Sequence, residues 1–384
     1  MASSRSVSLD EVVAHFQQLE GPRSTINLRH PLASVVVIAL LAVLAGAGGP
    51  TAIARWAAFK QEMLCGVLEL PYGVPGKDVF RRILMILQPA AFQACFAAWL
   101  ESLRAEAVAT TGVEQPILAV DGKTMRRGHD RANGLGAMHS VSVWAGEHGL
   151  SLGQLACGEK SNEITAVAEW LRLVDIKGAI ITIDAMGTPK AIAGQIVESG
   201  ADYVLALKGN QPALHKAVMA DFEEHLEGDL AAEQERVRTE TGHGREETRT
   251  YLQIPASPGL AEMGPWKGLR SIGMVSSRRV GAGKETVEIR YYISGLDVDV
   301  ERFARAVRGH WSIENACHWS LEMTFGEDQS RVRERHLGEN FGWLNRFALS
   351  LLKQHPGRQS VAMKRRGCGW SDAFLLEVVT ASTC

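Results

Sequence analysis

The feature that most constrains this fold is an alternation of short apolar segments with longer amphipathic ones, which begins near residue 116. Each short segment has the length of a strand, and most are rich in β-branched residues. The longer segments repeat apolar residues every three or four positions, which is the period of a helix. Strands that alternate with helices predict an α/β domain with a partly parallel sheet. The expected strands lie in PILAV, HSVSVWAG, LSLGQLACG, GAIITIDAMG and ADYVLALKGN.

The rest of the chain divides by its periodicity. A helical period dominates up to about residue 105 and returns after residue 300. Between these parts, the strand-like stretches TRTYLQI, SIGMVSSRRV and TVEIRYYISGL indicate a β-rich insertion. The expected segments are a helical N-terminal domain at 1–105, the first part of a core at 106–216, the insertion at 217–299, the end of the core at 300–353 and a tail at 354–384.

The composition is that of a folded, globular chain. Its 384 residues suffice for two or three domains. A formal net charge of −2 neither supports nor excludes a nucleic-acid partner, because the local placement of Lys and Arg decides that question. No two of the six Cys are spaced as CxxC, which argues against zinc-ribbon and thioredoxin-type sites. The first residues lack the pattern of a signal peptide, so we expect a cytoplasmic, nucleoid-associated protein.

One uncharged segment, residues 31–50, approaches the length that spans a bilayer. Its last part consists of Ala and Gly, which gain little from contact with lipid. We predict a buried helix here. A single membrane anchor is the less favoured alternative.

Two aspartates occupy equivalent positions, because Asp121 and Asp184 each end a short apolar strand. In open α/β sheets, ligands bind at the carboxyl ends of the strands. Neighbouring strands would bring the two carboxylates together, and a proton or a cation would have to relieve their repulsion. Magnesium fits this position, because it binds a few carboxylates together with substrate phosphate oxygens. The alternative for either Asp alone is a cap of the following turn or helix.

A third carboxylate, Glu314, lies in a stretch from 301 to 325 that has the pattern of one helix. A helical projection places Glu314 in the middle of an apolar face. That face holds Phe303, Val307, Trp311, His318, Leu321 and Phe325. A carboxylate on an inward face is costly unless it is paired or bound to metal. We expect a metal ligand, and the alternative is a structural pair with a buried Arg or His such as His318.

Basic residues flank these acids, as a phosphodiester substrate requires. Some follow the first Asp closely, one ends a strand, and others follow the helix of Glu314. Isolated charges of this kind are otherwise a solvated surface. The candidate phosphate contacts from this argument are Lys123, Arg126, Lys208, Arg331 and Arg333.

An ordered set of motifs resembles the transposases of ISAs-type insertion sequences, also called H-repeat-associated proteins. The resemblance covers nearly the whole chain, and the order of the motifs makes it specific where VDGK alone would be weak. The motifs read VDGKTMRR, ITIDAMGTPK, VLALKGNQ, HGREETR and RGHWSIENACHWSLEMTFGEDQSRVR.

The resemblance implies an acidic-triad (DDE) transposase with a ribonuclease-H-like core, in which helices flank a mixed sheet and a β-rich insertion precedes the third acid. It implies Asp121, Asp184 and Glu314 as catalytic metal ligands for two Mg²⁺ ions, with Mn²⁺ as a substitute. The implied activity is endonucleolytic cleavage and strand transfer on double-stranded DNA. The implied partners are the terminal inverted repeats of the element, target DNA and a second copy of the chain, with the N-terminal helices at the DNA ends.

The chain departs from the wider superfamily along the helix of the third acid. Where that pattern has Tyr, Arg and Lys around the Glu, this chain has Val307, His310 and Leu321. His310 and its neighbour Arg308 become the candidate phosphate contacts of this helix. Glu322 stands where Asp is usual, so Glu322 and Asp328 are alternative third ligands. The alternative functions are a catalytically inactive DNA-binding copy and a metal-dependent nuclease without strand transfer.

Overall fold

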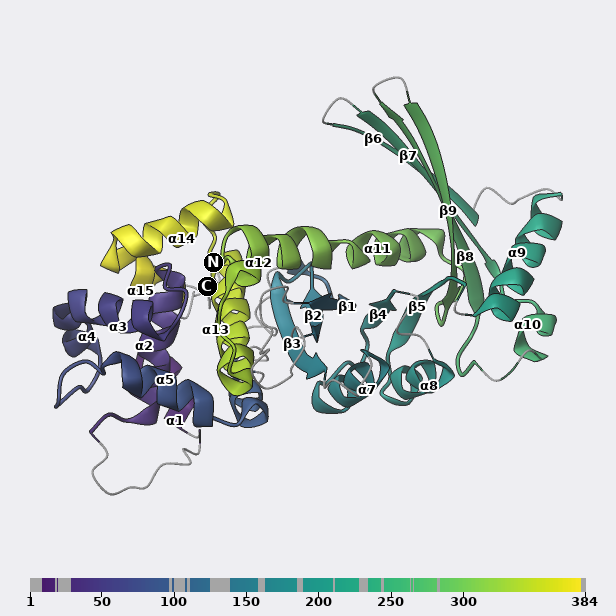
Figure 1. The fold of residues 1–384 in the computed structure, drawn as a ribbon. Coiled ribbons are helices and arrows are strands. Elements are labelled where there is room, and N and C mark those ends of the chain that lie inside the picture. The colour runs from purple at the N-terminus through teal and green to yellow at the C-terminus, as the bar shows by residue number, and fades with distance from the viewer. Residues whose placement is uncertain are drawn as a thin grey trace. The chain divides into compact units, whose positions relative to one another are not determined.

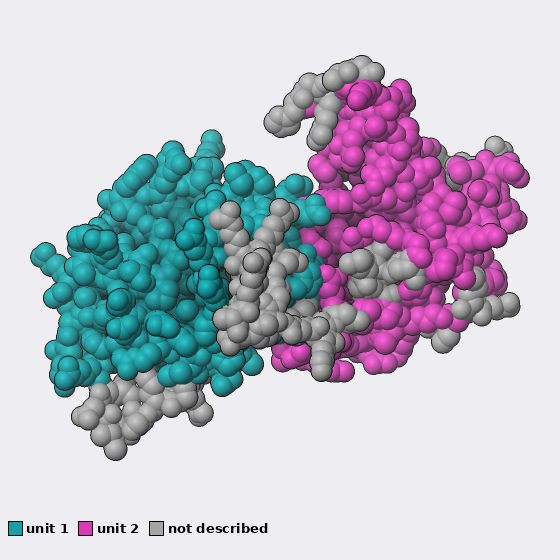
Figure 2. All heavy atoms as spheres, in the orientation of Figure 1, with its two compact units in different colours: residues 1–113, 122–159, 314–384 teal, residues 114–121, 160–313 magenta. Residues whose placement is uncertain are grey.

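The computed structural model contains a nine-stranded mixed sheet flanked by helices, in the strand order β3-β2-β1-β4-β5-β9-β8-β7-β6 (Figure 1). The predicted α/β fold with a mixed sheet and helical N-terminal region is confirmed. The described residues are 9–17, 19, 29–96, 99, 108, 111–124, 139–157, 163–184, 189–209, 211–227, 234–242, 245–262, 264, 266–281 and 284–380. The chain forms two compact units (Figure 2): unit 1 comprises 1–113, 122–159 and 314–384, and unit 2 comprises 114–121 and 160–313.

Unit 1 joins the helices from both ends of the chain with one hairpin. The hairpin consists of β2 (His139–Ala145) and β3 (Leu150–Cys157), which pair antiparallel; both strands were predicted. The helices before it are α1 (Leu9–Gln17), α2 (Leu32–Leu44), α3 (Pro50–Phe59), α4 (Gln61–Val67) and α5 (Lys77–Ile86). The elements after it are α12 (Trp319–Met323), the 3₁₀ helix η5 (Glu327–Gln329), α13 (Arg335–Gln354), α14 (Val361–Trp370) and α15 (Asp372–Thr380).

Two largely buried helices, the apolar α2 and the amphipathic α13, form the centre of unit 1. Every residue of α2 after its first is buried, and α13 contacts α2, α5 and β3. The side-chain amide of Asn340 on α13 donates to the carbonyl oxygens of Leu84 and Leu87 at 2.9 Å each, which satisfies acceptors at the end of α5. The prediction of a buried helix within residues 31–50 is thus confirmed. Among the helices that the structure describes, none is long and apolar enough to cross a membrane.

Unit 2 contains the parallel strands and the long antiparallel ones. The strands are β1 (Ile117–Thr124, of which 122–124 belong to unit 1), β4 (Ile180–Ile183), β5 (Asp202–Leu207), β6 (Glu235–Gly242), β7 (Arg245–Pro255), β8 (Ser271–Gly281) and β9 (Lys284–Ser294). Its helices are α7 (Glu163–Leu173), α8 (Lys190–Glu198), α9 (Pro212–Leu226), α10 (Pro258–Glu262) and α11 (Val300–His310). The strands β7, β8 and β9 confirm the three that were predicted here. Strand β6 was missed, because its sequence ERVRTETG is too polar to read as a strand.

Helix α11 covers one face of this sheet, and α7 and α8 lie on the other (Figure 1). The strand period of two places alternate side chains on the α11 face. These side chains pack with α11 in one buried cluster, which includes Ile117, Ile180, Val204, Tyr251, Val275, Tyr292, Phe303 and Val307. The apolar side of α11 therefore determines which side chains of the strands are buried on this face of the sheet.

Glycines allow α11 to lie close against the strands. A Cβ added at Gly309 of α11 would come within 2.8 Å of the Ile117 side chain on β1. A Cβ added at Gly273 of β8 would overlap the ring of Phe303 on α11. Both positions thus require the absence of a side chain for packing reasons.

We predict that Gly273→Ala destabilises the protein by about 1–3 kcal/mol, the usual cost of overpacking a core. The added methyl group must displace the buried Phe303 ring. The matched control is Gly66→Ala in helix α4, where a Cβ meets nothing within 4 Å, and which should be neutral or slightly stabilising. Denaturant unfolding measures both variants, and equal stability of the two would contradict this account of α11 packing.

Candidate active site

The two aspartates lie at the same edge of adjoining parallel strands. Strands β1 and β4 pair in parallel with Val120 opposite Ile183, so Asp121 and Asp184 are the next residues in register. The condition under which the two carboxylates would come together, that their strands are neighbours, is therefore met. Alternation along the strands puts both aspartates on the face whose buried members include Ile117 and Ile180, which is the face that α11 covers.

The donor chemistry of this edge suits a hard cation. Asp121 and Asp184 are both only partly buried, so both residues are accessible to solvent. Carboxylate oxygens are the ligands that Mg²⁺ prefers, and two like charges in register favour a cation between them. Within the described residues, no group of three or more His, Cys, Asp or Glu side chains is arranged as a metal site. The two aspartates therefore fit a divalent ion as part of a ligand set.

Lys208 contacts one of these acids directly. It follows β5, the strand that pairs with β4, and its Nζ lies 3.0 Å from each carboxylate oxygen of Asp184. About half of each side chain is exposed, so this ion pair is solvated and weak. The predicted phosphate contact Lys208 is thus placed beside the second acid.

His310, at the end of α11, lies near Asp184 through its contact with Thr182 of β4. Its Nδ1 lies 3.0 Å from Oγ1 of Thr182, two residues before Asp184 on the same face of β4. Burial lowers the pKa of His310 to about 4, although the Asp184 carboxylate opposes this effect. The imidazole is therefore neutral near neutral pH. Any phosphate contact it makes would be a hydrogen bond and not an ion pair.

Arg290 on β9 is a further cation of this region, and the sequence did not predict it as a phosphate contact. Its guanidinium carbon lies 4.5 Å from the centre of the Trp311 ring, and its Nε donates to Glu288 at 2.8 Å. Asp184 is close enough to act electrostatically on Arg290. The alternating pattern of EIRYYIS identifies a strand, but only the pairing of β9 with β5 brings Arg290 to the acids.

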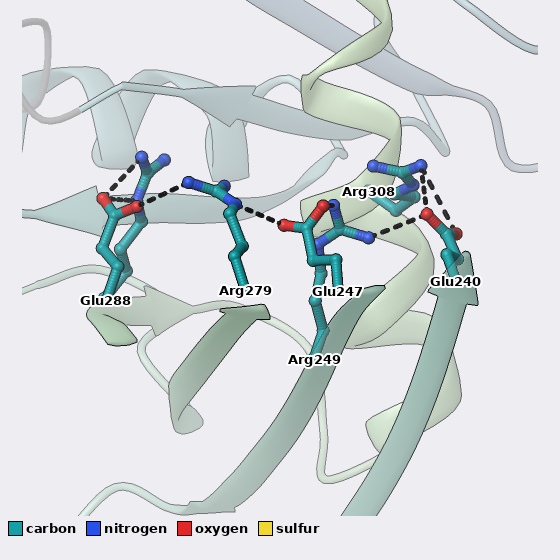
Figure 3. Close-up of polar contacts among 7 residues, drawn as sticks. Glu240, Glu247, Arg249, Arg279, Glu288 and Arg308 are labelled. Atoms are coloured by element: carbon teal, nitrogen blue, oxygen red, sulfur yellow. Dashed lines mark hydrogen bonds and ion pairs between the residues drawn. The ribbon is translucent and has the colours of Figure 1, made fainter. Parts of the chain in front are cut away.

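A row of alternating charges crosses four strands and includes Glu288, Arg279 and Arg308 (Figure 3). Arg290 is one end of this row through its ion pair with Glu288 at 2.7 Å. Glu288 also lies 3.8 Å from Arg279, and Glu247 bridges Arg279 and Arg249 at 2.8 and 2.6 Å. The row then continues through Glu240, which lies 3.0 Å from both Arg249 and Arg308. The predicted phosphate contact Arg308 is therefore the opposite end of this row, on α11.

The third acid does not lie as the helical projection placed it. Helix α11 ends at His310, a π-helical turn η4 follows at Ile313–His318, and α12 continues from Trp319. A π turn holds more residues than an α turn and changes which residues face inward. Ile313 and Cys317 are fully buried, whereas Glu314 is exposed. The expectation of a buried Glu314 on one continuous helix was wrong, although π turns are frequent at functional sites.

Lys123 belongs to a buried ionic network of unit 1. With 6% of its side chain exposed, its Nζ lies 3.2 Å from Glu322, 3.3 Å from Glu327 and 3.9 Å from Asp328. Glu327 also binds Arg346 at 2.8 Å. Burial alone would raise the pKa of Glu327, but Arg346 and Lys123 outweigh burial and lower it. This arrangement engages Lys123 with carboxylates rather than presenting it to phosphate, and it gives the alternative ligands Glu322 and Asp328 a cationic partner.

The remaining predicted contacts are less constrained. Arg331 and Arg333 are exposed in the irregular segment between η5 and α13. Their exposure leaves them accessible to a ligand, but nothing in their surroundings selects one. Arg126 lies outside the described residues.

Comparison with known proteins shows matches along almost the whole chain. Residues 13–100 match the family model described as DDE_Tnp_1-associated, and residues 113–351 match the model described as Transposase DDE domain. The "H repeat-associated putative transposase YhhI" of Escherichia coli (strain K12) is 33% identical over 385 residues, which cover 98% of this chain and 99% of the relative. The "Putative transposase YncI" of Escherichia coli O157:H7 is 34% identical over 384 residues, which cover 98% and 96%.

The ionic network of unit 1 leads to a prediction about pH. Burial, together with the positive charges of Arg346 and Lys123, lowers the pKa of His318 to about 3 against the opposing effect of Glu327. The unfolded chain takes up a proton at this residue below about pH 6.5, whereas the folded chain does not. The free energy of unfolding should therefore fall as the pH decreases from about 6.5 towards 3.

The variant His318→Gln, which is neutral at every pH, should show a smaller loss of stability. Between about pH 7 and about pH 5, the loss should shrink by about 1–2 kcal/mol relative to the unchanged protein. Urea unfolding at a series of pH values measures this difference. An identical pH dependence in the two proteins would contradict a neutral, buried His318.

Proposed function

Because the chain belongs to the transposases with a DDE domain, a family that acts on DNA and generally uses divalent metal ions, we propose that it cleaves and joins DNA at the ends of an insertion sequence. The observation that carries this proposal is the parallel register of β1 and β4, which brings Asp121 and Asp184 to one edge of the sheet. Neighbouring carboxylates can hold the divalent ions that two-metal nucleases and polymerases use to cleave and form phosphodiester bonds.

Asp121, Asp184 and Glu314 would hold two Mg²⁺ ions, for which Mn²⁺ can substitute. Bound there, the ions would activate the attacking water or DNA 3′-hydroxyl and stabilise the leaving oxygen. The chain's own part is to position the carboxylates, which the paired ends of β1 and β4 do for the two aspartates. Glu314, which is exposed on the π turn, is proposed as the third ligand because the family has an acid at this place in its motif.

The cations beside this edge would bind the DNA backbone. Lys208 is the best placed, because a phosphate could take the place of the solvated Asp184 carboxylate as its partner once that carboxylate binds metal. His310 would donate a hydrogen bond as a neutral imidazole. Arg308, Arg331, Arg333 and Arg126 are the further contacts that we propose, whereas Lys123 serves the buried network of unit 1.

The N-terminal helices would recognise the terminal inverted repeats of the element. The separate family model that matches residues 13–100 supports a distinct role for this part of the chain. Two ends must be brought together before they are joined to target DNA, so we propose a homodimer on DNA. The alternatives are an inactive DNA-binding copy and a nuclease without strand transfer; the presence of all three acids favours an active enzyme over the first.

We predict that Asp184→Ala abolishes metal-dependent DNA cleavage while DNA binding persists. The loss should be about a thousand-fold or more, because a metal ligand contributes several kcal/mol to transition-state stabilisation. The substrate is a plasmid that carries the DNA flanking this gene, incubated with the purified full chain and Mg²⁺.

Asp297→Ala is the matched control, since Asp297 is an exposed carboxylate of the same unit with a surface partner, Arg270. The Asp297→Ala variant should cleave DNA at the same rate as the unmodified protein. If the unmodified chain binds the flanking DNA without cutting it, the inactive copy is the better description. Cutting without joined products in a strand-transfer assay would identify the nuclease.

A further inference from the structure

Arg290 lies where the strand pairing places a second cation beside Lys208. Strands β5 and β9 pair antiparallel, and their last pair is Leu207 with Tyr291. Lys208 and Arg290 are the next residues on each strand and point to the same face. That face is also the one on which α11 packs, because Tyr292 of β9 contacts Phe303 of α11 with ring centres 5.6 Å apart.

The guanidinium of Arg290 is held in a defined orientation. The Trp311 ring lies 4.5 Å below it, and Glu288 accepts from its Nε at 2.8 Å. Trp311 follows His310, which is itself held to Thr182 of β4. Stacking and one side-chain acceptor thus restrain a long side chain whose ordering would otherwise cost entropy on binding. A restrained guanidinium is suited to bidentate recognition of a phosphate.

Glu288 pairs closely with Arg290, 2.7 Å from its Nη2 and 2.8 Å from its Nε, and lies 3.8 Å from Arg279. The whole row contains four arginines (290, 279, 249 and 308) and three glutamates (288, 247 and 240), which leaves one positive charge. Both ends of the row are arginines. The end at Arg290 is the one within electrostatic reach of Asp184. Burial acts to lower the pKa of Arg290, but Glu288, Tyr292 and Asp184 together outweigh it and raise the pKa. An arginine is in any case charged near neutral pH.

We infer that Arg290, backed by Trp311, binds a backbone phosphate of the DNA strand that enters the edge beside Asp184. The inference rests on the proposed function of this edge and adds a binding residue to it. Arg290 of β9 and Lys208, which follows the neighbouring strand β5, would bind the phosphodiester together. The chemical class of the ligand is a phosphodiester, recognised by charge and bidentate hydrogen bonds and not by base identity.

A merely structural Arg290 would instead hold the row of charges together. The two roles predict different dependences of DNA-binding affinity on salt concentration. Each phosphate contact releases counterions, so its loss lowers the slope of log affinity against log salt concentration by about 0.9. Loss of a structural ion pair changes the affinity through folding and leaves that slope unchanged.

The test compares Arg290→Gln with Arg279→Gln in the full chain. Arg279 is the matched control, because it lies in the same row and shares Glu288, but it belongs to β8, one strand farther from β5. The probes are short duplexes that tile the DNA flanking this gene, and binding is measured in EDTA over a series of salt concentrations so that nothing is cut. Thermal unfolding of each variant checks that the fold persists.

We expect Arg290→Gln to weaken binding about tenfold and to lower the salt slope by about one contact, while Arg279→Gln keeps the slope. Arg290→Lys should restore the slope but not the full affinity, since an ammonium cannot bind in bidentate fashion. An unchanged slope in Arg290→Gln overturns the inference and leaves the proposed function intact. Equal losses in both glutamine variants assign the effect to the row of charges and overturn it as well. Absence of DNA binding by the unmodified chain would overturn the inference and the proposed function together.

Discussion

The parallel pairing of β1 with β4 is the interaction on which the candidate site depends. A one-residue shift of this register would turn one aspartate to the opposite face, because side chains alternate along a strand. The register is held by burial, since Ile117 and Ile180 must both face α11 in the apolar cluster. The same hydrophobic constraint that folds unit 2 therefore also sets where its two carboxylates lie. Strand β5 extends the arrangement by one strand and adds Lys208 at the same edge.

Helix α11 links this edge to the long strands. It is amphipathic, and its inward face meets residues of β1, β4, β5, β7, β8 and β9. In its last turn, His310 forms a hydrogen bond with Thr182 of β4. Arg308 of the same helix forms an ion pair with Glu240 of β6. The long strands are thus tied to the helix that borders the acids, both by the apolar cluster and by the row of charges in Figure 3. The ion pairs at the two ends of the row are solvated and individually weak. The apolar cluster therefore supplies most of this attachment.

The ionic network of unit 1 uses charge in a different way. Glu327 and Arg346 are almost completely buried, and Lys123 and His318 lie close to them. Removing one member of such a network leaves a buried charge without compensation, which costs far more than the loss of a surface pair. The charged residues of this chain therefore divide by burial. Most members of the row in Figure 3 remain partly exposed, although Glu247 within it is buried, whereas Glu327 and Arg346 lie in the interior of unit 1.

The sequence by itself determined the α/β class, the buried helix at residues 31–50, most strands and the equivalence of Asp121 and Asp184. Local periodicity and the polarity change at strand ends carry that information, and the order of motifs identified the family. The tertiary structure decided the rest. Glu314 turned outward because a π turn interrupts the regular period, and Lys123 became buried because distant acids converge on it. Arg290 joined Lys208 because β5 pairs with a strand far along the chain. Pairing between distant segments leaves no mark on local pattern, so only the folded chain reveals which charges share an edge.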